Sequence, residues 1–531
     1  MWRELPLEER EEYKRMILSF ASLTEMFAQK AENDDEDVIL SPIINSKYQE
    51  TVFQKVFNAF AEDIGNTSYD ASLVRQNPDG TTTKYLIGIK TFGYASGNQK
   101  IAQFKAYSGE WSDIIGEMNR NAKGLTDKEE VNRVNHDLYK ELAVRIAALR
   151  NLRMDSAEAE LKGFSLSLQR DNIQAVYHVL MPSKKGEPPV IYVGETSYTK
   201  IDLDRIRILG CTSPKTPANF EFTDGRHKYR YTAADSQLLM DFTNKDIALE
   251  EWKVVYAENA YEIFSEIGNR VLEEHTKPKK KKIESYSWLI TNKDGEVERY
   301  SGFNGFYGVG SKVDKESRKR RVDSLRRKFS TLPAMMMITL VGELYLFLDL
   351  NENRTLTREE KVALRERILK QLDKCGNTAL KHDVVKMLFR PQSEMYIPLP
   401  YSASFHKAHP DFFGKNLGVL DGKRLRNKVH FTLVFEPSGD SCEAFLTQDY
   451  GKAIESASSQ AILGDWVLRD VFQLGAYEPL TAERLTEVGK NGVRIWKEEG
   501  DSRIHLCFIW IDTDSLPEDY ISKDKKKAPA E

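Results

Sequence analysis

Two carboxylates and one lysine within the first hundred residues have types and spacings that suit metal-dependent chemistry: Glu50, Asp70 and Lys90. Carboxylate oxygens are the hard ligands that Mg²⁺ prefers, and a bound metal lowers the pKa of its water. An ammonium group beside them helps to position the nucleophile and to neutralise a phosphate. The trio therefore suits hydrolysis of a phosphodiester bond.

The residues around Asp70 and Lys90 predict a β-hairpin. Segments 68–75 and 81–92 are strand-like, and Asn77–Gly80 between them is a good turn sequence. A turn centred there places Asp70 beside Gly88 and Lys90. Because side chains alternate along a strand, Gly88 and Lys90 point to the same face.

A helix from Ser46 to about Glu62 is expected to bring Glu50 to this hairpin. An apolar stripe on this helix is formed by Phe53, Phe57 and Phe60, which are spaced four and three residues apart. Packing of the stripe on the hairpin would place Glu50 near the Asp and the Lys. A purely structural interpretation stays open. A glutamate early in a helix favours the helix dipole, an aspartate at a strand start often caps a turn, and a lysine at a strand end often reaches solvent.

Segments 69–72 and 87–92 resemble the active-site hairpin of PD-(D/E)xK nucleases, the fold of many type II restriction endonucleases. In that class an Asp and a second acid bind Mg²⁺, and the Lys assists the attacking water. The resemblance therefore assigns metal binding to Asp70 and assistance of the attacking water to Lys90. Gly88 stands where the second acid is expected. Some members use a glutamate on the preceding helix, so the resemblance points to Glu50 as the replacement.

Helical sequence is expected to resume at about Asn98. Gln103 and Tyr107 within it resemble the QxxxY helix element of the RecB-like branch of these nucleases, which faces the active site or the DNA. The resemblance therefore adds Gln103 to the catalytic set. Lys100 and Lys105 on the same segment become candidates for DNA contact.

The region from about Met395 to Asp514 has many short strand-like runs and predicts a mixed, barrel-like domain. Residues 445–456 and 463–466 resemble the DNA-binding pseudobarrel of EcoRII-like restriction enzymes and of plant transcription factors, which grips the major groove with two polar arms. Each candidate is also compatible with an ordinary solvated side chain. The resemblance implies contacts by residues chemically suited to bases or phosphates: Gln448, Lys452 and Ser456 in one arm, and Asn491, Arg494 and Lys497 in the other.

One segment is strongly basic in a chain whose 77 basic and 81 acidic residues nearly cancel. Residues 277–328 hold 16 Lys and Arg against 7 Asp and Glu, beginning with a lysine run that predicts an exposed linker. The glycine-rich stretch 301–310 lacks the GKS or GKT ending of a P-loop, which argues against an ATPase. Phe303 or Tyr307 is expected against sugar or base. Phosphate contacts are expected from Asn304, Lys312, Arg318, Arg320 and Arg321, with a solvated helix face as the alternative.

These patterns predict a multidomain α+β protein with a nuclease-like α/β core, a basic middle region and a C-terminal β-pseudobarrel. The expected boundaries are 1–275, 276–390, 391–520 and a charged tail at 521–531. No run is long and apolar enough for a membrane helix, and the first residues are too charged for a signal peptide. The four cysteines form no CxxC pair, which argues against a structural zinc site and a disulfide framework. A cytoplasmic protein is expected.

The sequence therefore predicts a Mg²⁺-dependent, site-specific endonuclease of double-stranded DNA, of the restriction type. This class implies a companion DNA methyltransferase and allows a homodimer. Gly88 keeps open a second hypothesis, a non-catalytic, sequence-specific DNA-binding protein with a degenerate nuclease fold. An RNA-processing nuclease is disfavoured by the resemblance to DNA-reading domains.

Overall fold

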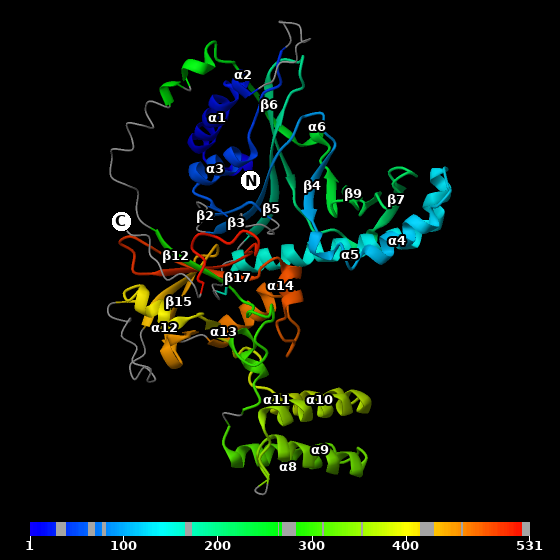
Figure 1. Cartoon of the computed structure of the whole chain (residues 1–531), viewed down its shortest axis with the longest axis vertical. Coiled ribbons are helices and arrows are strands. Elements are labelled where there is room, and N and C mark those ends of the chain that lie inside the picture. Colours follow the sequence, from blue (N-terminus) through cyan, green and yellow to red (C-terminus); the bar gives the residue numbers. More distant parts are fainter. Residues whose placement is uncertain are drawn as a thin grey trace.

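The computed structural model describes residues 1–27, 39–61, 69–76, 81–164, 172–263, 265–267, 283–310, 313–351, 354–414, 430–457 and 460–522 (Figure 1). The strands in these ranges form three sheets, so the chain is a mixed helix-and-strand protein. The predicted turn at 77–80, the lysine-rich linker at 277–282 and the tail from 523 lie outside the described residues. In the described ranges, no helix is both long and apolar enough to cross a membrane.

The first sheet has six strands in the order β1-β2-β3-β5-β6-β11. β3 and β5 are parallel, and the other neighbours are antiparallel. A parallel pair needs a long connection, and here it includes the 35-residue helix α5 (Lys128–Lys162), whose start is capped by Asp127. The strands are β1 (Phe60–Ala61), β2 (Ala71–Gln76), β3 (Thr82–Thr91), β5 (Asn172–Pro182), β6 (Val190–Ser197) and β11 (Ala248–Lys253).

Helices α1 (Leu7–Ala21) and α3 (Ser46–Phe57) pack against one face of this sheet, and the short α2 (Thr24–Phe27) lies between them in sequence (Figure 1). The helix predicted to reach Glu62 ends earlier. Asn58 adopts a left-handed conformation with φ 50°, and Phe60 belongs to β1 rather than to the helical stripe.

The second sheet has five antiparallel strands in the order β4-β10-β9-β8-β7. The helix predicted from residue 98 is wrong, because β4 pairs with β10 and the chain reaches only a 3₁₀ turn at Lys105–Tyr107. Helices α4 (Ser112–Asn121) and α5 share a core with this sheet. The strands are β4 (Asn98–Gln103), β7 (Arg207–Cys211), β8 (Phe220–Thr223), β9 (Lys228–Thr232) and β10 (Gln237–Asp241), with α6 (Asn244–Ile247) after them.

The third sheet has seven strands in the order β12-β17-β18-β14-β15-β16-β13 and curls into a half-barrel. α12 (Ser402–Ala408) follows β13 in the chain. His406 of α12 contacts the carbonyl of Gly451, next to β16, and His409 contacts Tyr286 of β12. The strands are β12 (Ile283–Leu289), β13 (Ile397–Pro398), β14 (His430–Phe435), β15 (Asp440–Thr447), β16 (Ala453–Ser456), β17 (Gly492–Glu498) and β18 (Ile504–Ile509).

Three further helical segments pack on the half-barrel: α13 (Gln460–Asp465), the π-helical turn η6 (Trp466–Val471) and α14 (Ala482–Val488). Figure 1 shows α5 running across the middle of the molecule, with the first two sheets on one side and the half-barrel on the other. The same long helix thus supports both halves.

The middle region predicted at 276–390 does not form one unit. Strand β12 belongs to the half-barrel, since it pairs along β17 over its whole length. The turn at residues 302–307 also packs in the half-barrel core, whereas the helices between residues 315 and 388 form a helical module with its own apolar core, which lies at the end of the molecule (Figure 1). The boundary near residue 391 therefore separates the helices from the sheet but misses β12. The module consists of α8 (Lys315–Lys328), α9 (Ala334–Phe347), α10 (Arg358–Cys375) and α11 (Thr378–Leu388).

Candidate active site and nucleic-acid interface

The hairpin of β2 and β3 brings Asp70 and Lys90 together. The register pairs Ala71 with Ile87, which places Asp70 at the end of the ladder, where its backbone N–H donates to the carbonyl of Ile87. Lys90 Nζ lies 3.2 Å from Asp70 Oδ2, and the backbone N–H of Ile89 donates to the same oxygen at 2.6 Å. Both contacts use Oδ2, so Oδ1 makes none within the described ranges.

Gly88 has no room for the acid that the nuclease pattern expects. A Cβ at Gly88 would lie 2.6 Å from Cδ1 of Tyr177, on the neighbouring strand β5. The Tyr177 ring stacks on Tyr198 with centroids 4.0 Å apart, and both rings are buried. Two aromatic rings therefore fill the space of the missing carboxylate, so a second acidic ligand has to come from outside β3.

Glu50 lies on the helix that covers the opposite face of the sheet from Gly88. The side chains of Ile87 and Ile89 share a core with α3, whereas Gly88 faces Tyr177 in the other core. Thr91 nevertheless hydrogen-bonds to Gln49, so the first turns of α3 reach the end of β3 next to Lys90. Glu50 is 13% exposed and forms an ion pair of 2.8 Å with Lys47. Among the described residues, Glu50 forms no hydrogen bond or ion pair with Asp70 or Lys90.

Gln103 lies away from the hairpin, at the end of β4 in the second sheet. Its Nε2 donates to the carbonyl of Asp235 at 3.1 Å, and its own carbonyl accepts from Arg153. Tyr107 is buried and stacks on Trp111, so the two residues do not form the expected helical QxxxY element. The DNA-contact candidates Lys100 and Lys105 on this segment are exposed.

The described residues contain no group of three or more His, Cys, Asp or Glu arranged to hold a metal ion. All four cysteines are free. On the hairpin itself, Asp70 is the candidate cation ligand, and the Glu50 carboxylate on α3 is not brought into contact with it among the described residues.

The glycine-rich stretch is a buried 3₁₀ turn, η4 (Gly302–Tyr307), and not an exposed phosphate loop. Phe303 and Tyr307 lie in the apolar core of the half-barrel, where neither can stack on a sugar or base. The Asn304 amide donates to the carbonyl of Leu480 at 2.9 Å and accepts from its N–H at 2.8 Å. The DNA contact predicted for Asn304 is therefore wrong.

The basic helix α8 carries Arg320 and Arg321 on its exposed side, whereas Arg318 is partly buried and donates to the carbonyl of Leu348. Arg320 also donates to Ser317 Oγ at 3.1 Å. Lys312 lies outside the described residues. Two of the predicted arginines therefore lie on an exposed basic surface, whereas Arg318 stabilises the helical module through its hydrogen bond to Leu348.

The first predicted reading arm has one buried and two accessible members. Gln448 is half-buried, with φ 64°, at the connection between β15 and β16, and Lys452 is exposed directly before the first residue of β16. Ser456 is 6% exposed within β16, so it is unsuited to reading a base. The chain forms a 3₁₀ turn (Asp449–Gly451) directly before Lys452.

The second predicted arm lies in an acidic cleft. Asn491 binds the backbone of Ile511 on both sides, through Nδ2 at 3.0 Å and Oδ1 at 2.7 Å, and is therefore structural. Arg494 is paired with Asp519 at 2.9 Å. Burial raises the pKa of the Asp519 carboxyl, but the hydrogen bond from Ser287 and the charge of Arg494 outweigh it, so that this pKa lies below its ordinary value.

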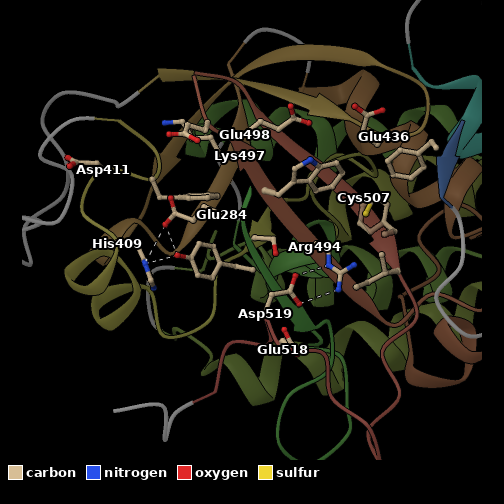
Figure 2. A pocket seen from close by; sticks show the side chains of 18 of the residues that line it. Glu284, His409, Asp411, Glu436, Arg494, Lys497, Glu498, Cys507, Glu518 and Asp519 are labelled. Carbon is tan, nitrogen blue, oxygen red and sulfur yellow. Dashed lines mark hydrogen bonds and ion pairs between the residues drawn. The ribbon is translucent and has the colours of Figure 1, made fainter. Parts of the chain in front are cut away.

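The cleft has a volume of about 1410 Å³ and lies between the half-barrel and Phe60 of the first sheet (Figure 2). Two cations, Arg494 and Lys497, face a clear excess of carboxylates, which would repel DNA phosphates. The predicted DNA contacts of Arg494 and Lys497 are therefore disfavoured. The carboxylates that line the cleft are Glu160, Glu284, Asp411, Glu436, Glu498, Glu499, Glu518 and Asp519.

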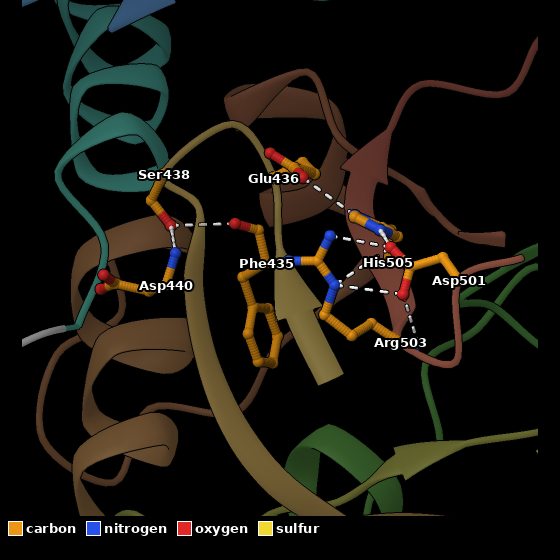
Figure 3. Close-up of polar contacts among 7 residues, drawn as sticks. All are labelled: Phe435, Glu436, Ser438, Asp440, Asp501, Arg503 and His505. Carbon is orange, nitrogen blue, oxygen red and sulfur yellow. Dashed lines mark hydrogen bonds and ion pairs between the residues drawn. The ribbon is translucent and has the colours of Figure 1, made fainter. Parts of the chain in front are cut away.

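One wall of the cleft contains a polar network at the end of β14 (Figure 3). His505 Nδ1 lies 2.9 Å from Glu436, and Asp501 forms an ion pair of 2.7 Å with Arg503. The turn that follows packs against the end of α5. A Cβ at Gly163, which has φ 76°, would lie 2.3 Å from Asp440 Oδ2, so only glycine allows this approach.

Neither a scan against protein-family models nor a search of curated proteins finds a match to this chain. The fold and the site together define a mixed helix-and-strand protein. An Asp–Lys pair lies at the open end of a β-hairpin, and a basic helical module adjoins a curled sheet.

Proposed function

We propose that the chain is a Mg²⁺-dependent endonuclease that cleaves double-stranded DNA at specific sites. The observation that carries the proposal is the ion pair of Asp70 and Lys90 at the end of a two-stranded hairpin, 3.2 Å apart. The nuclease resemblance implies an Asp and a Lys held side by side on one hairpin, as Asp70 before β2 and Lys90 on β3 are. The proposal keeps the restriction setting, with a cytoplasmic enzyme, a companion DNA methyltransferase and homodimer formation as its parts.

The donor set suits a hard divalent cation. The contacts of Asp70 with Ile89 and Lys90 use Oδ2, which leaves Oδ1 to bind the cation. Glu50 would add a second oxygen from the start of α3. Mg²⁺ bound there would supply a water of lowered pKa and positive charge at the departing oxygen. Lys90 holds its ammonium group beside Asp70, where it neutralises a phosphate and orients a water by hydrogen bonding.

Sequence-selective contact is assigned to the connection of β15 and β16, with Gln448 and Lys452. Gln reads adenine bidentately, and Lys usually contacts phosphate. Arg320 and Arg321 on the exposed side of α8 supply non-specific phosphate contact. This placement replaces the acidic cleft as the DNA-facing surface.

A second candidate function is a non-catalytic DNA-binding protein with a degenerate nuclease unit. The specific observation that favours it is the Tyr177 ring in the place of the second acid at Gly88. Because the ring is buried and stacked, the site would keep only one carboxylate on the hairpin itself. The two functions differ in whether Glu50 completes the site.

Cleavage of plasmid DNA by the purified chain with Mg²⁺ or with a chelator tests the proposal. Asp70→Asn, Lys90→Met and Glu50→Gln should each lower the cleavage rate by about a hundredfold or more, the loss typical of a general acid–base or metal-ligand group. DNA affinity should stay unchanged, because the reading residues lie elsewhere.

Matched controls are Asp113→Asn on α4 and Lys140→Met on α5, which remove the same charges from exposed positions. Both should cut at the wild-type rate. A wild-type protein that binds chosen sequences but cuts none of them in Mg²⁺ would establish the second function. Cleavage that survives all three hairpin and helix substitutions would refute the site.

A further inference from the structure

A small cationic pocket lies where the helical module meets the half-barrel. Its volume is about 340 Å³, near the lower end of the range of roughly 300–1,000 Å³ for small-molecule sites. It is formed by the ends of α9 and α11, one side of α8 and the loop that carries Tyr477. A pocket of this size holds one small ligand and excludes a DNA duplex.

Positive charge dominates this pocket. Four cations line it, Arg318, Arg321, Lys386 and Arg390, and its single lining carboxylate, Glu394, is paired with Arg390 at 2.8 Å. Within the described ranges, Arg321 and Lys386 form no ion pair, and Arg318 Nε is buried without a hydrogen-bond partner. Holding these charges together is unfavourable, and a bound anion would offset the repulsion.

The rest of the wall is apolar and aromatic. Phe347 is 2% exposed, and Phe389 and Tyr477 lie with their ring centroids 4.9 Å apart at the pocket. Planar rings of this kind stack on nucleic acid bases. The pocket therefore offers a ring-binding side and a phosphate-binding side in one cavity of about 340 Å³.

The geometry points to a binding site for a single nucleotide, with its phosphate at Arg318, Arg321 and Lys386 and its base against the aromatic wall. Inorganic anions would satisfy the cations alone, whereas a nucleotide uses both sides. The nucleotide comes either from free nucleoside monophosphate or from the end of a DNA strand. This site is independent of the hairpin, so its existence does not depend on the proposed nuclease activity.

Titration calorimetry of the full chain with dAMP tests the site. Saturable binding of one dAMP per chain is expected, at least about tenfold tighter than binding of inorganic phosphate, because the phosphate lacks the stacked base. The double variant Arg321→Gln/Lys386→Gln should weaken dAMP binding by about tenfold or more, since two charge-assisted contacts are lost. Asp70→Asn should leave it unchanged.

The matched control is Arg327→Gln/Lys370→Gln, which removes one exposed arginine from α8 and one exposed lysine from α10, outside the pocket. It should change dAMP affinity by less than about twofold, since exposed charges act weakly at a distance. Circular dichroism on both double variants confirms that they fold. Equal loss in the control, equal affinity for dAMP and phosphate, or absence of saturable dAMP binding would each overturn the assignment.

Competition distinguishes the two sources of the nucleotide. A short single-stranded oligonucleotide that displaces a fluorescent dAMP analogue, where closed circular plasmid does not, assigns the pocket to a strand end. Displacement by free dAMP alone assigns it to the free nucleotide. Displacement by closed circular plasmid as efficiently as by the oligonucleotide would overturn the single-nucleotide assignment, because a closed circular duplex has no strand end to insert.

Discussion

The ion pair of Lys490 and Glu160 joins the two halves of the protein. Glu160 lies in the last turn of α5, and Lys490 lies just before β17 of the half-barrel, with the charged atoms 2.5 Å apart. The side chains are only 2% and 3% exposed. Substitution of Lys490 by Met removes one charge and leaves the glutamate buried.

The expected loss is large because the surviving charge is almost fully buried. Breaking a buried pair by removing one partner typically costs about 3–5 kcal/mol, against total stabilities of roughly 5–15 kcal/mol. Lys490→Met and Glu160→Gln should each show this loss. The double variant should recover to within about 1 kcal/mol of wild type, because replacing both charges of a buried pair is often neutral.

Urea unfolding followed by both circular dichroism and tryptophan fluorescence measures these free energies of unfolding. Lys200→Met is the control at an exposed ion pair of the same helix: Lys200, in the loop after β6, pairs with Asp155 and Glu158 of α5 but is 42% exposed, so its loss should cost about 0–1 kcal/mol. A Lys490→Met protein that loses less than about 1 kcal/mol, or a double variant no more stable than either single one, would refute the reasoning.

Three further predictions concern stability. Burial lowers the pKa of His178 to about 3, so its imidazole is neutral in the fold but titrates near 6.5 when unfolded. The free energy of unfolding is therefore unaffected by this histidine above pH 6.5, and below it falls by up to about 1.4 kcal/mol per pH unit down to pH 3. The urea midpoints of His178→Gln should fall less steeply with decreasing pH than those of the wild type over this range. Lys84→Met removes the donor to the carbonyls of Leu161 and residue 162 at the end of α5, which should cost about 1–3 kcal/mol in urea unfolding. Gly464→Ala would bring a Cβ to 1.9 Å from the carbonyl oxygen of Ser393 and should lower stability by about 1–3 kcal/mol, measured as a lower melting temperature.

The hairpin was predictable because its signals are local. The strand-like runs predicted the pairing, and the observed register, with Ala71 opposite Ile87, places Asp70 next to Gly88 as expected. Strand β4 was missed for the opposite reason. Its residues, Asn98–Gln103, are mostly polar and show no clear alternation, and their strand form depends on pairing with residues 237–241, far along the chain.

Partners distant in sequence also decided which polar residues stay available. Nothing near Asn304 indicates that its amide will bind Leu480, and nothing near Arg494 indicates Asp519. A glycine-rich stretch suggested an exposed loop, but Phe303 and Phe306 within it gain more by burial in the core of the half-barrel. Residue type alone could not separate a DNA contact from a structural amide.

The distribution of charge now favours one side of the molecule for DNA. The excess of carboxylates makes the cleft that holds Arg494 unfavourable for the proposed duplex, while a cavity of about 270 Å³ is lined by both Arg390 and Gln448. Arg390 also lines the cationic pocket beside α8. The proposed reading connection, the proposed nucleotide site and the basic helix are therefore neighbours, which lets one bound strand contact all three without crossing the acidic surface.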